Sequence, residues 1–578
     1  MEINRSSKLF IIICLAIALQ NSLQLLGQDE TYCNPINIDY TYMIYDAHKD
    51  LSYRSGADPA VVRFRNEYYM FVTRSLGYWH SDDLQHWNFV TPEKWYFQGS
   101  NAPTAFNYKD SVLYVAGNPS GNGSILFTDN PKKGDWKATP SIVNGLQDPA
   151  LFIDDDGKTY LYWGSSNTFP LRLYTLDRKL RFRPSETAHE LFKLLPEKHG
   201  WERFGENHSD TILAGYMEGA WPTKYNGKYY LQYAAPGTEF NVYGDGAYIG
   251  DSPLGPFTYM PNSPFSYKPG GYINGAGHGS TVLGPGDVFW HFATMAVGVN
   301  IGWERRIGAF PTFFDEDGLM YSNTRFGDYP HYAPSVPEKQ GRFTGWMLLS
   351  YRKQVKVSSQ VEAHGGERLT DENVKTFWLA RNNDQDQWVE IDLGKPGQIY
   401  AIQINYNDYN SDLYGKIPGL YHSYILEGSL NGTNWSVLID KSKSNKDVPN
   451  DYEVLQNAAK ARYIRFKNVH APTPYLSVSA IRIFGLGSGK TPGTPKNKRA
   501  ARKEDQREAI ISWNPVKNAQ GYNVFWGIAR DKLYNSWLVY DKSTLELKSL
   551  NSDQQYFFSI EAFNENGVSE MTAPLKIN

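Results

Sequence analysis

The sequence predicts an all-β protein, a five-bladed β-propeller followed by two β-sandwich domains. A strand pair closed by a polar turn recurs five times between residues 55 and 330, starting near positions 58, 102, 148, 219 and 278. The spacing of roughly 45 to 70 residues suits a four-stranded propeller blade with its loops. No long amphipathic helical stretch interrupts this region, and aromatic residues, which favour strands, make up 15% of the chain.

The individual repeats have clear strand and turn signals. Leu151 to Ile153 and Tyr160 to Trp163 flank an acidic turn, and Asn226-Gly227 separates two further aromatic runs, which is a strong hairpin signal. At 578 residues the chain suits about three domains. We place the propeller at residues 28–335, because the composition changes near Pro334.

The second domain is expected at residues 345–487. Strict alternation in Trp388 to Leu393 predicts a half-buried strand. The order of motifs over about 130 residues resembles the discoidin-like (coagulation factor type C) module. Such modules often bind sugars through loops at one end, which makes Tyr409, Tyr414 and Tyr421 candidates, but a purely structural role is an equal alternative.

The third domain is expected at residues 496–578, after a Pro/Gly/Lys-rich linker from Gly487 to Pro495. Its strand pattern resembles a fibronectin type III domain. By this resemblance Trp513 is the core tryptophan and Tyr556 the tyrosine-corner residue. Such a domain usually serves as a spacer or a packing partner.

The N-terminus predicts export. Arg5 and Lys8 precede an apolar run from Leu9 to Leu19, which suits a signal peptide over residues 1–27 and is too short to span a bilayer comfortably. After its removal no membrane span is expected and Cys33 is the single cysteine, so neither an intramolecular disulfide nor a cysteine zinc cluster can form. This composition favours a periplasmic or extracellular protein of a bacterium. The net charge of −3, without a clustered basic face, gives no case for nucleic acid.

Three acidic residues stand at similar points of the repeats and indicate the chemistry. Asp58, Asp148 and Glu218 each immediately precede an inner strand pair. A single Asp-Pro or Glu-Gly is usually an ordinary turn opener, but three in register can converge on one mouth of the channel. Converging carboxylates are what glycosidic bond cleavage needs.

These motifs on five blades resemble glycoside hydrolase family 43 over about residues 30–335. The resemblance implies that Asp58 is the general base, Glu218 the general acid and Asp148 an orienting carboxylate that raises the pKa of the acid. It also implies inversion of the anomeric configuration. The acid motif has Ala220 where many relatives have proline, which weakens any subfamily assignment.

Further site residues follow from their positions in the repeat. His278 should face the channel, and the resemblance implies a calcium ion held there, directly or through water; a satisfied polar residue is an equal alternative. Arg305 resembles the family's substrate-binding arginine, with Arg306 as the alternative and a structural salt bridge open for either. Trp79, Trp163 and Trp221 are near the acid-bearing strands and are candidates for stacking on a sugar or for the core.

The sequence therefore predicts an exo-acting or debranching hydrolase of a plant-type polysaccharide, with α-L-arabinofuranosidase first by family frequency. A β-xylosidase or a galactan-active exo-hydrolase is the alternative within the family. The related retaining fructan hydrolases fit poorly, because their motifs differ from Ala57-Asp58-Pro59-Ala60 and Glu218-Gly219. A catalytically silent, sugar-binding surface protein is the alternative from another class.

Overall fold

The computed structural model describes residues 30–45, 48–94, 100–122, 124–139, 144–177, 183–184, 187–299 and 302–578. The predicted signal peptide lies outside the described residues. Over these ranges the chain is almost entirely β, as predicted, and helix is limited to five short 3-10 turns: Pro131–Lys133, Gly200–Glu202, Glu206–His208, Pro285–Asp287 and Gly366–Thr370. In the described residues, no helix has both the length and the apolar character that crossing a membrane requires.

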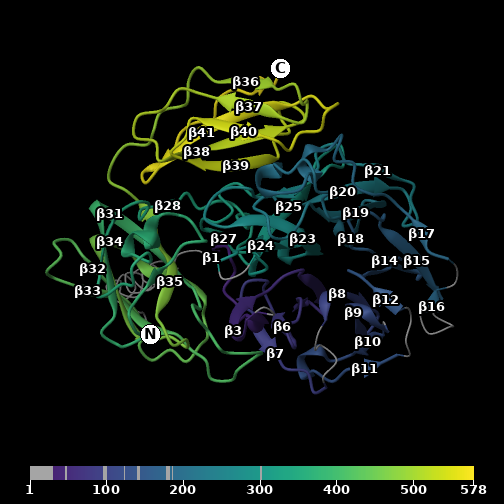
Figure 1. The fold of residues 1–578 in the computed structure, drawn as a ribbon, viewed down its shortest axis with the longest axis horizontal. Helices are drawn as coiled ribbons and strands as arrows, with labels where there is room; N and C mark the ends of the chain where they lie inside the picture. The colour runs from purple at the N-terminus through teal and green to yellow at the C-terminus, as the bar shows by residue number, and fades with distance from the viewer. Residues whose placement is uncertain are drawn as a thin grey trace, which may run out of the picture.

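Five antiparallel sheets follow one another along the first part of the chain (Figure 1). The first contains β4 (Ala60–Phe64), β5 (Glu67–Phe71), β6 (Tyr78–Ser81) and β7 (Asn88–Val90). The second contains β8 (Asn101–Tyr108), β9 (Ser111–Asn122), β10 (Ile125–Thr128), β11 (Lys137–Ala138) and β12 (Asn144–Leu146). The third contains β13 (Ala150–Ile153), β14 (Thr159–Trp163), β15 (Arg172–Asp177), β16 (Arg183–Pro184) and β17 (His189–Glu190).

The fourth sheet contains β18 (Glu218–Tyr225), β19 (Lys228–Ala235), β20 (Gly244–Gly250), β21 (Phe257–Tyr259) and β22 (Ser266–Tyr267). The fifth contains β23 (Asn274–Leu283), β24 (Phe289–Ala296), β25 (Arg305–Phe314) and β26 (Met320–Ser322). Two small pairs complete this part: β1 (Thr31–Tyr32) with β27 (His331–Tyr332), and β2 (Thr41–Tyr45) with β3 (His48–Ser55).

The first strands of the five sheets form a closed ring of contacts. β4 contacts β8, β8 contacts β13, β13 contacts β18, β18 contacts β23, and β23 returns to β4. A residue with left-handed backbone lies just before each of these strands or within its first five residues: φ is 55° at Asp58, 37° at Ala102, 46° at Asp148, 64° at Gly219 and 43° at His278. These are the five positions at which the sequence places the repeat starts. A left-handed residue therefore lies near the start of every inner strand, although four of the five residues are not glycine.

The second part forms one eight-stranded sheet around its own apolar core. Its strands are β28 (Met347–Leu348), β29 (Gln354–Val357), β30 (Trp378–Leu379), β31 (Trp388–Tyr406), β32 (Ser423–Ser429), β33 (Ser436–Asp440), β34 (Asn450–His470) and β35 (Ser477–Leu486). The long strands β31 and β34 change register twice along their pairing. Such bulges bend a strand, so that one strand can serve both faces of a core.

The third part has a three-stranded and a five-stranded sheet that share one core. The strands are β36 (Arg499–Arg502), β37 (Ala509–Ser512), β38 (Gly521–Gly527), β39 (Asn535–Tyr540), β40 (Thr544–Leu547), β41 (Phe557–Asn564), β42 (Gly567–Val568) and β43 (Leu575–Lys576). Trp513 is buried in this core against Tyr522, and the Tyr556 hydroxyl accepts a hydrogen bond from the Asn551 backbone N–H at 3.2 Å. That this part is a fibronectin type III domain stays a prediction.

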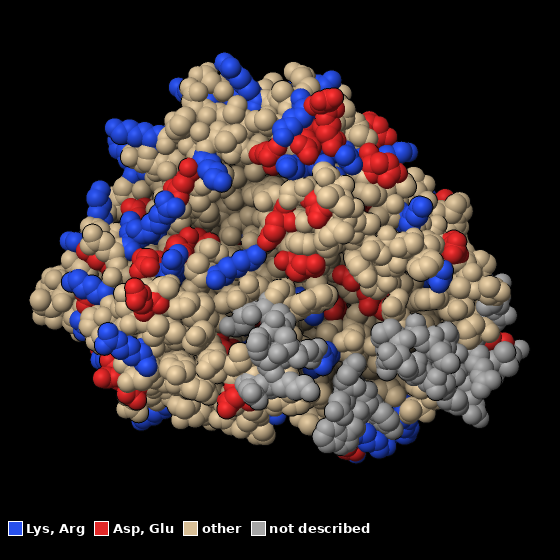
Figure 2. All heavy atoms as spheres, viewed as in Figure 1, with Lys and Arg blue, Asp and Glu red and all other residues tan. Residues whose placement is uncertain are grey.

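The three parts pack closely on one another, and Figure 1 shows the C-terminal strands lying across the other two parts. One apolar cluster takes Cys33 and Tyr329 from the first part, Phe484 from the second and Phe563 from the third. On the face shown in Figure 2, Lys and Arg are interspersed with Asp and Glu.

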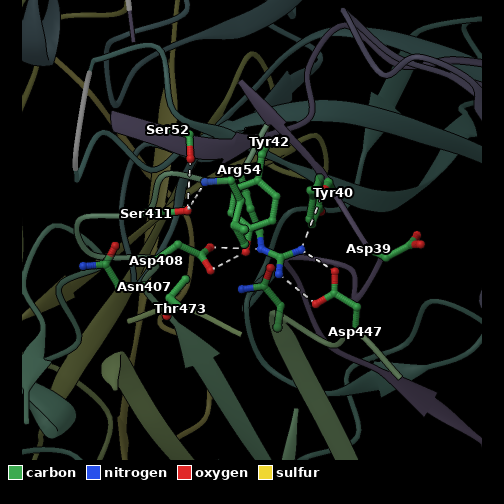
Figure 3. A network of polar contacts seen from close by, with 12 residues as sticks. Asp39, Tyr40, Tyr42, Ser52, Arg54, Asn407, Asp408, Ser411, Asp447 and Thr473 are labelled. Carbon is green, nitrogen blue, oxygen red and sulfur yellow. Dashed lines mark hydrogen bonds and ion pairs between the residues drawn. The ribbon is translucent and has the colours of Figure 1, made fainter. Parts of the chain in front are cut away.

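A buried charge network joins the first and second parts (Figure 3). Arg54 on β3 is fully buried; its Nε lies 3.0 Å from Asp408, and two nitrogens lie 2.6 and 2.7 Å from the Asp447 carboxylate. Tyr42 stacks on the guanidinium and donates a hydrogen bond to Asp408 at 2.8 Å. Because the charges are paired and hydrogen-bonded, they can remain ionised away from water.

We predict that Asp447→Asn destabilises the protein in a pH-dependent way. Removing one partner of a buried ion pair costs about 3 kcal/mol. Burial alone would raise the pKa of Asp447. The charges of Arg54 and His422 lower it by more than burial raises it, so the net shift of the pKa is downward. A lowered native pKa stabilises the fold above the pKa of the unfolded state, and this contribution is lost as the pH falls.

Urea unfolding at pH 7 and near pH 3 measures this effect. The difference between wild type and Asp447→Asn should be large at pH 7 and smaller at pH 3. Asp412→Asn, on an exposed aspartate of the neighbouring loop, should change little at either pH. An equal cost for Asp447→Asn at both pH values would contradict the ionic explanation.

Candidate active site

The structure brings the three predicted acids and His278 together at the start of the inner strands. The His278 Nδ1 lies 3.3 Å from Asp58 Oδ1 and 4.0 Å from Asp148 Oδ2. One ligand atom each of Asp148, Glu218 and His278 lies within 4.8 Å of the others. Asp58, Asp148 and His278 occupy the left-handed positions of their repeats, whereas Glu218 precedes the left-handed Gly219 by one residue.

Glu218 is held by two hydroxyl groups. The Tyr243 hydroxyl donates a hydrogen bond to Oε1 at 2.5 Å, and the Ser165 hydroxyl donates one to Oε2 at 3.2 Å. Tyr243 is buried, and burial together with the negative charge of Glu218 raises the pKa of its phenol well above the usual value. The phenol therefore stays protonated and fixes the carboxyl group in one orientation.

Asp58 has an environment that keeps it ionised. The Thr73 hydroxyl donates to its Oδ2, and Arg305 Nη1 lies 3.8 Å from its Oδ1. Burial raises the pKa of Asp58, but the charges of His278 and Arg305 and the hydroxyl donors outweigh it and lower the pKa. A carboxylate that is ionised at neutral pH can accept a proton from water.

Asp148 has the opposite environment. Burial raises its pKa; the charge of His278 lowers it, and the nearby Glu218 and Asp58 raise it again, to about 7. Like charges so close together cannot all ionise freely. Asp148 therefore holds a proton near neutral pH, within the same cluster as Glu218.

The backbone of His278 is held by the buried residue Asp245, which in turn contacts the buried His291. Asp245 accepts hydrogen bonds from the backbone N–H groups of His278 and Gly279 at 2.7 and 2.9 Å, and its Oδ2 lies 3.0 Å from His291 Nε2. Burial lowers the pKa of His278, but the negative charges of Asp58, Asp148 and Glu218 outweigh it and raise the pKa. The imidazolium supplies a positive charge among the carboxylates.

The donor set around His278 fits direct calcium binding poorly. It offers one ring nitrogen and the carboxylates of Asp148 and Glu218. Calcium takes six to eight oxygen ligands, and these two carboxylates are the ones that the proton chemistry needs. Calcium near His278 stays a prediction, and no step below uses it.

Arg305 rather than Arg306 faces the acids. The Arg305 Nη1 contacts Thr238 at 3.3 Å and lies 3.8 Å from Asp58, as given above. Arg306 follows on β25 and so points to the other face of the sheet, where it donates to the Arg54 carbonyl at 2.7 Å. The alternation of the strand thus puts Arg305, and not Arg306, beside Asp58, and substrate binding by Arg305 stays a prediction.

The three predicted tryptophans lie in different places. Trp79 is completely buried in an apolar cluster and donates a hydrogen bond to Asp39 at 2.6 Å, so the prediction that it stacks on a sugar is wrong. Trp163 stacks on Tyr174 with ring centroids 5.7 Å apart. Trp221 lines a cavity of about 500 Å³ among the inner strands, beyond Glu218. For these last two, sugar contact stays a prediction.

The candidate tyrosines of the second part also differ. Tyr421 stacks on His470 with centroids 4.0 Å apart, and Tyr409 packs against Phe377. Tyr414 is 54% exposed. Of the three candidates, Tyr414 has the most open side chain.

Sequence reasoning missed several residues that position the site. Tyr243, Ser165, Asp245 and Thr73 hold the acids and His278, as described above. Tyr243 and Asp245 lie in the aromatic, glycine-rich segment from Phe240 to Gly246, a composition that could have indicated a site-lining loop. Ser165 and Thr73 carry no comparable signal, because hydroxyl residues are common after strands.

Family profiles match two segments of the chain. Residues 52–320 match "Glycosyl hydrolases family 43", and residues 354–481 match "F5/8 type C domain". The chain contains a family 43 glycoside hydrolase domain. A discoidin-like domain follows it, as the sequence predicted.

Curated relatives match parts of the hydrolase region. "Xylosidase/arabinosidase 43A" of Humicola insolens is 28% identical over 161 residues, which cover 23% of this chain and 48% of the relative. "Beta-xylosidase" of Xylanibacter ruminicola is 30% identical over 129 residues, 20% of this chain and 39% of the relative. The chain thus spans less than half the length of these two relatives.

Among solved structures, a "thermostable family-43 glycoside hydrolase" aligns with 53% of this chain and 99% of its own, at 18% identity and a TM-score of 0.43. With so low a score, this likeness says nothing about the substrate.

We predict that Gly219→Ala disrupts the site more than its backbone conformation alone explains. Gly219 has φ +64°, and a Cβ there would lie 2.7 Å from the His278 ring. Gly227, with φ +75°, has no atom within 4 Å of a Cβ and provides a matched control. A non-glycine residue in this conformation costs about 1 to 2 kcal/mol at either position.

Thermal unfolding and turnover of a glycoside distinguish the two variants. Gly227→Ala should lose only this backbone contribution and keep its turnover. Gly219→Ala should in addition displace His278 and lower turnover at least tenfold. Equal behaviour of the two variants would mean that the contact between Gly219 and His278 has no role.

Proposed function

We propose that the chain is an inverting glycoside hydrolase that removes single sugars, α-L-arabinofuranose first among them, from the ends or branches of a plant-type polysaccharide. The observation that carries the proposal is that an ionised Asp58 and a proton-holding Asp148 lie together with Glu218 and His278 at the same mouth of the inner strands. A concerted inversion needs one carboxylate in each of these states.

Within this proposal each side chain has one task. Asp58 accepts the proton of the attacking water, and Glu218 donates a proton to the leaving oxygen. Asp148 holds a proton close to Glu218. Tyr243 and Ser165 orient the Glu218 carboxyl group by hydrogen bonds. Arg305 binds a substrate hydroxyl beside Asp58.

We propose further that the five sheets are the blades of a five-bladed propeller. The closed ring of contacts among β4, β8, β13, β18 and β23 supports it. We propose that the last part is a fibronectin type III domain, because Trp513 is buried in its core and Tyr556 forms the corner hydrogen bond. We also propose that residues 1–27 are a signal peptide that directs export of the chain.

The choice of sugar has weaker support. Arabinofuranose is first by family frequency, and one relative is named both a xylosidase and an arabinosidase. A β-xylosidase or galactan-active exo-hydrolase is the alternative within the family. A catalytically silent sugar-binding protein is the alternative from another class, and it is disfavoured because all three acids are present and hydrogen-bonded or charge-coupled.

We predict that Asp58→Asn and Glu218→Gln each lower kcat by about 10²- to 10⁴-fold, because each removes one half of a concerted proton transfer. Turnover of an aryl glycoside and circular dichroism measure activity and fold together. Asp129→Asn and Glu190→Gln change exposed acids of the same domain and should keep full turnover. Near-normal kcat in a folded Asp58→Asn variant would refute the assignment.

We predict that the first product is a monosaccharide of inverted configuration. Proton NMR of a branched arabinan during early hydrolysis reads the sugar and its anomer in one experiment. Arabinose with the anomer opposite to that of the substrate supports the proposal. A ladder of oligosaccharides would indicate an endo mode, the retained anomer would exclude inversion, and xylose or galactose released from other polymers would change only the sugar.

A further inference from the structure

Trp303 is an exposed tryptophan beside the acids. Its exposed fraction is 54%, whereas the other tryptophans that the structure describes are buried or half-buried. Leaving a large indole in water forgoes the stabilisation that burial provides. An exposed aromatic ring next to a candidate site is therefore a candidate for ligand contact.

The ring is tied to the acid centre through Arg305. The Arg305 guanidinium carbon lies 5.7 Å from the Trp303 ring centroid, and the same guanidinium lies 3.8 Å from Asp58 Oδ1. The Trp303 carbonyl accepts a hydrogen bond from the Ser55 hydroxyl at 3.3 Å. The turn that carries the indole is thus anchored, and one side chain separates the ring from the candidate base.

Glu239 flanks the same turn. A Cβ at Gly302 would lie 3.9 Å from the Glu239 Cβ. The preceding residue, Thr238, contacts Arg305 at 3.3 Å. Glu239 is half-buried; burial raises its pKa, and the charge of Glu218 adds to the shift. Glu239 is therefore a fourth carboxylate in the field of the acid centre, although neither the family motifs nor the proposed proton transfers use it.

Together these residues form a pattern suited to a sugar. An indole surface packs against the C–H face of a pyranose or furanose ring, and a carboxylate on a neighbouring segment accepts hydrogen bonds from hydroxyl groups. Arg305 stacks on the indole and so fixes its plane, which lowers the entropy cost of ligand binding.

We propose that Trp303 and Glu239 form a second sugar-binding subsite, which holds the sugar unit next to the one that the acids release. This inference rests on the proposed glycoside hydrolase function. It gives Trp303 the role of a stacking platform and Glu239 that of a hydroxyl acceptor. It assigns Arg305 a double role, since its guanidinium lies between the two subsites.

Two substrates of the same sugar test the proposal. A glycosyl fluoride has no second sugar, whereas the shortest oligosaccharide that wild type cleaves has one. For Trp303→Ala, kcat/KM for the oligosaccharide should fall about 10-fold more than for the fluoride, the order of one aromatic stacking interaction. Trp303→Phe should recover most of this difference, and Glu239→Gln should also lower the oligosaccharide value selectively.

Leu430→Ala serves as the matched control, because Leu430 is 53% exposed in a turn of the second part. It should leave both substrates unchanged. Equal losses on both substrates for Trp303→Ala would show that Trp303 acts only by supporting Arg305, and no loss on either would show that it binds no sugar; both results overturn the inference alone. A wild-type protein that cleaves neither substrate would overturn the proposed function first, and the inference with it.

Discussion

The hydrogen bond from Tyr243 to Glu218 connects the chemistry of the site to the packing of the whole chain. The preceding residue, Val242, is fully buried in the core of the third part, and Phe240 packs against the same core. The segment that carries the phenol is therefore held by strands that lie more than 250 residues later in the sequence. A carboxyl group whose orientation must hold to a fraction of an ångström needs such support.

The left-handed residues at the repeat starts impose a second constraint. Each non-glycine residue in this conformation is strained by about 1 to 2 kcal/mol. The ring of inner strands, closed between β23 and β4, offsets this cost with packing and hydrogen bonds. Asp245 further stabilises the turn by accepting hydrogen bonds from the backbone N–H groups of His278 and Gly279. The left-handed backbone directs the side chains of Asp58, Asp148 and His278 toward one another. Glu218 is not itself left-handed; it directly precedes the left-handed Gly219, and its side chain lies in the same cluster.

Features that recur in every repeat could be predicted from the sequence. Contacts that occur only once between distant segments could not. The five repeat starts and the convergence of the acids follow from spacing, because equivalent positions in a repeat lie in equivalent places. The error at Trp79 has a physical cause: every sheet needs large apolar side chains in its core, and composition cannot distinguish them from a sugar platform. Tyr243 and Ser165 reach Glu218 from other segments, so no local pattern relates them to it. The choice between Arg305 and Arg306 required the direction of β25.

Buried charges hold the three parts in fixed relation. Arg482 of β35 pairs with Glu372 at 2.9 Å and lies 3.9 Å from Asp328 of the first part, and these three side chains are buried. Arg325 of the first part lies 2.7 Å from Glu561 of the third part. The Arg482 guanidinium also stacks on Tyr272 and Phe484. Domains joined by flexible linkers move relative to one another by default, but an interface with a shared apolar core and paired buried charges resists such motion. The backbone N–H groups of Gly487 and Gly489 likewise donate hydrogen bonds to Glu565 and Asn566 of the third part. The discoidin-like domain is thus held in a fixed position relative to the first and third parts.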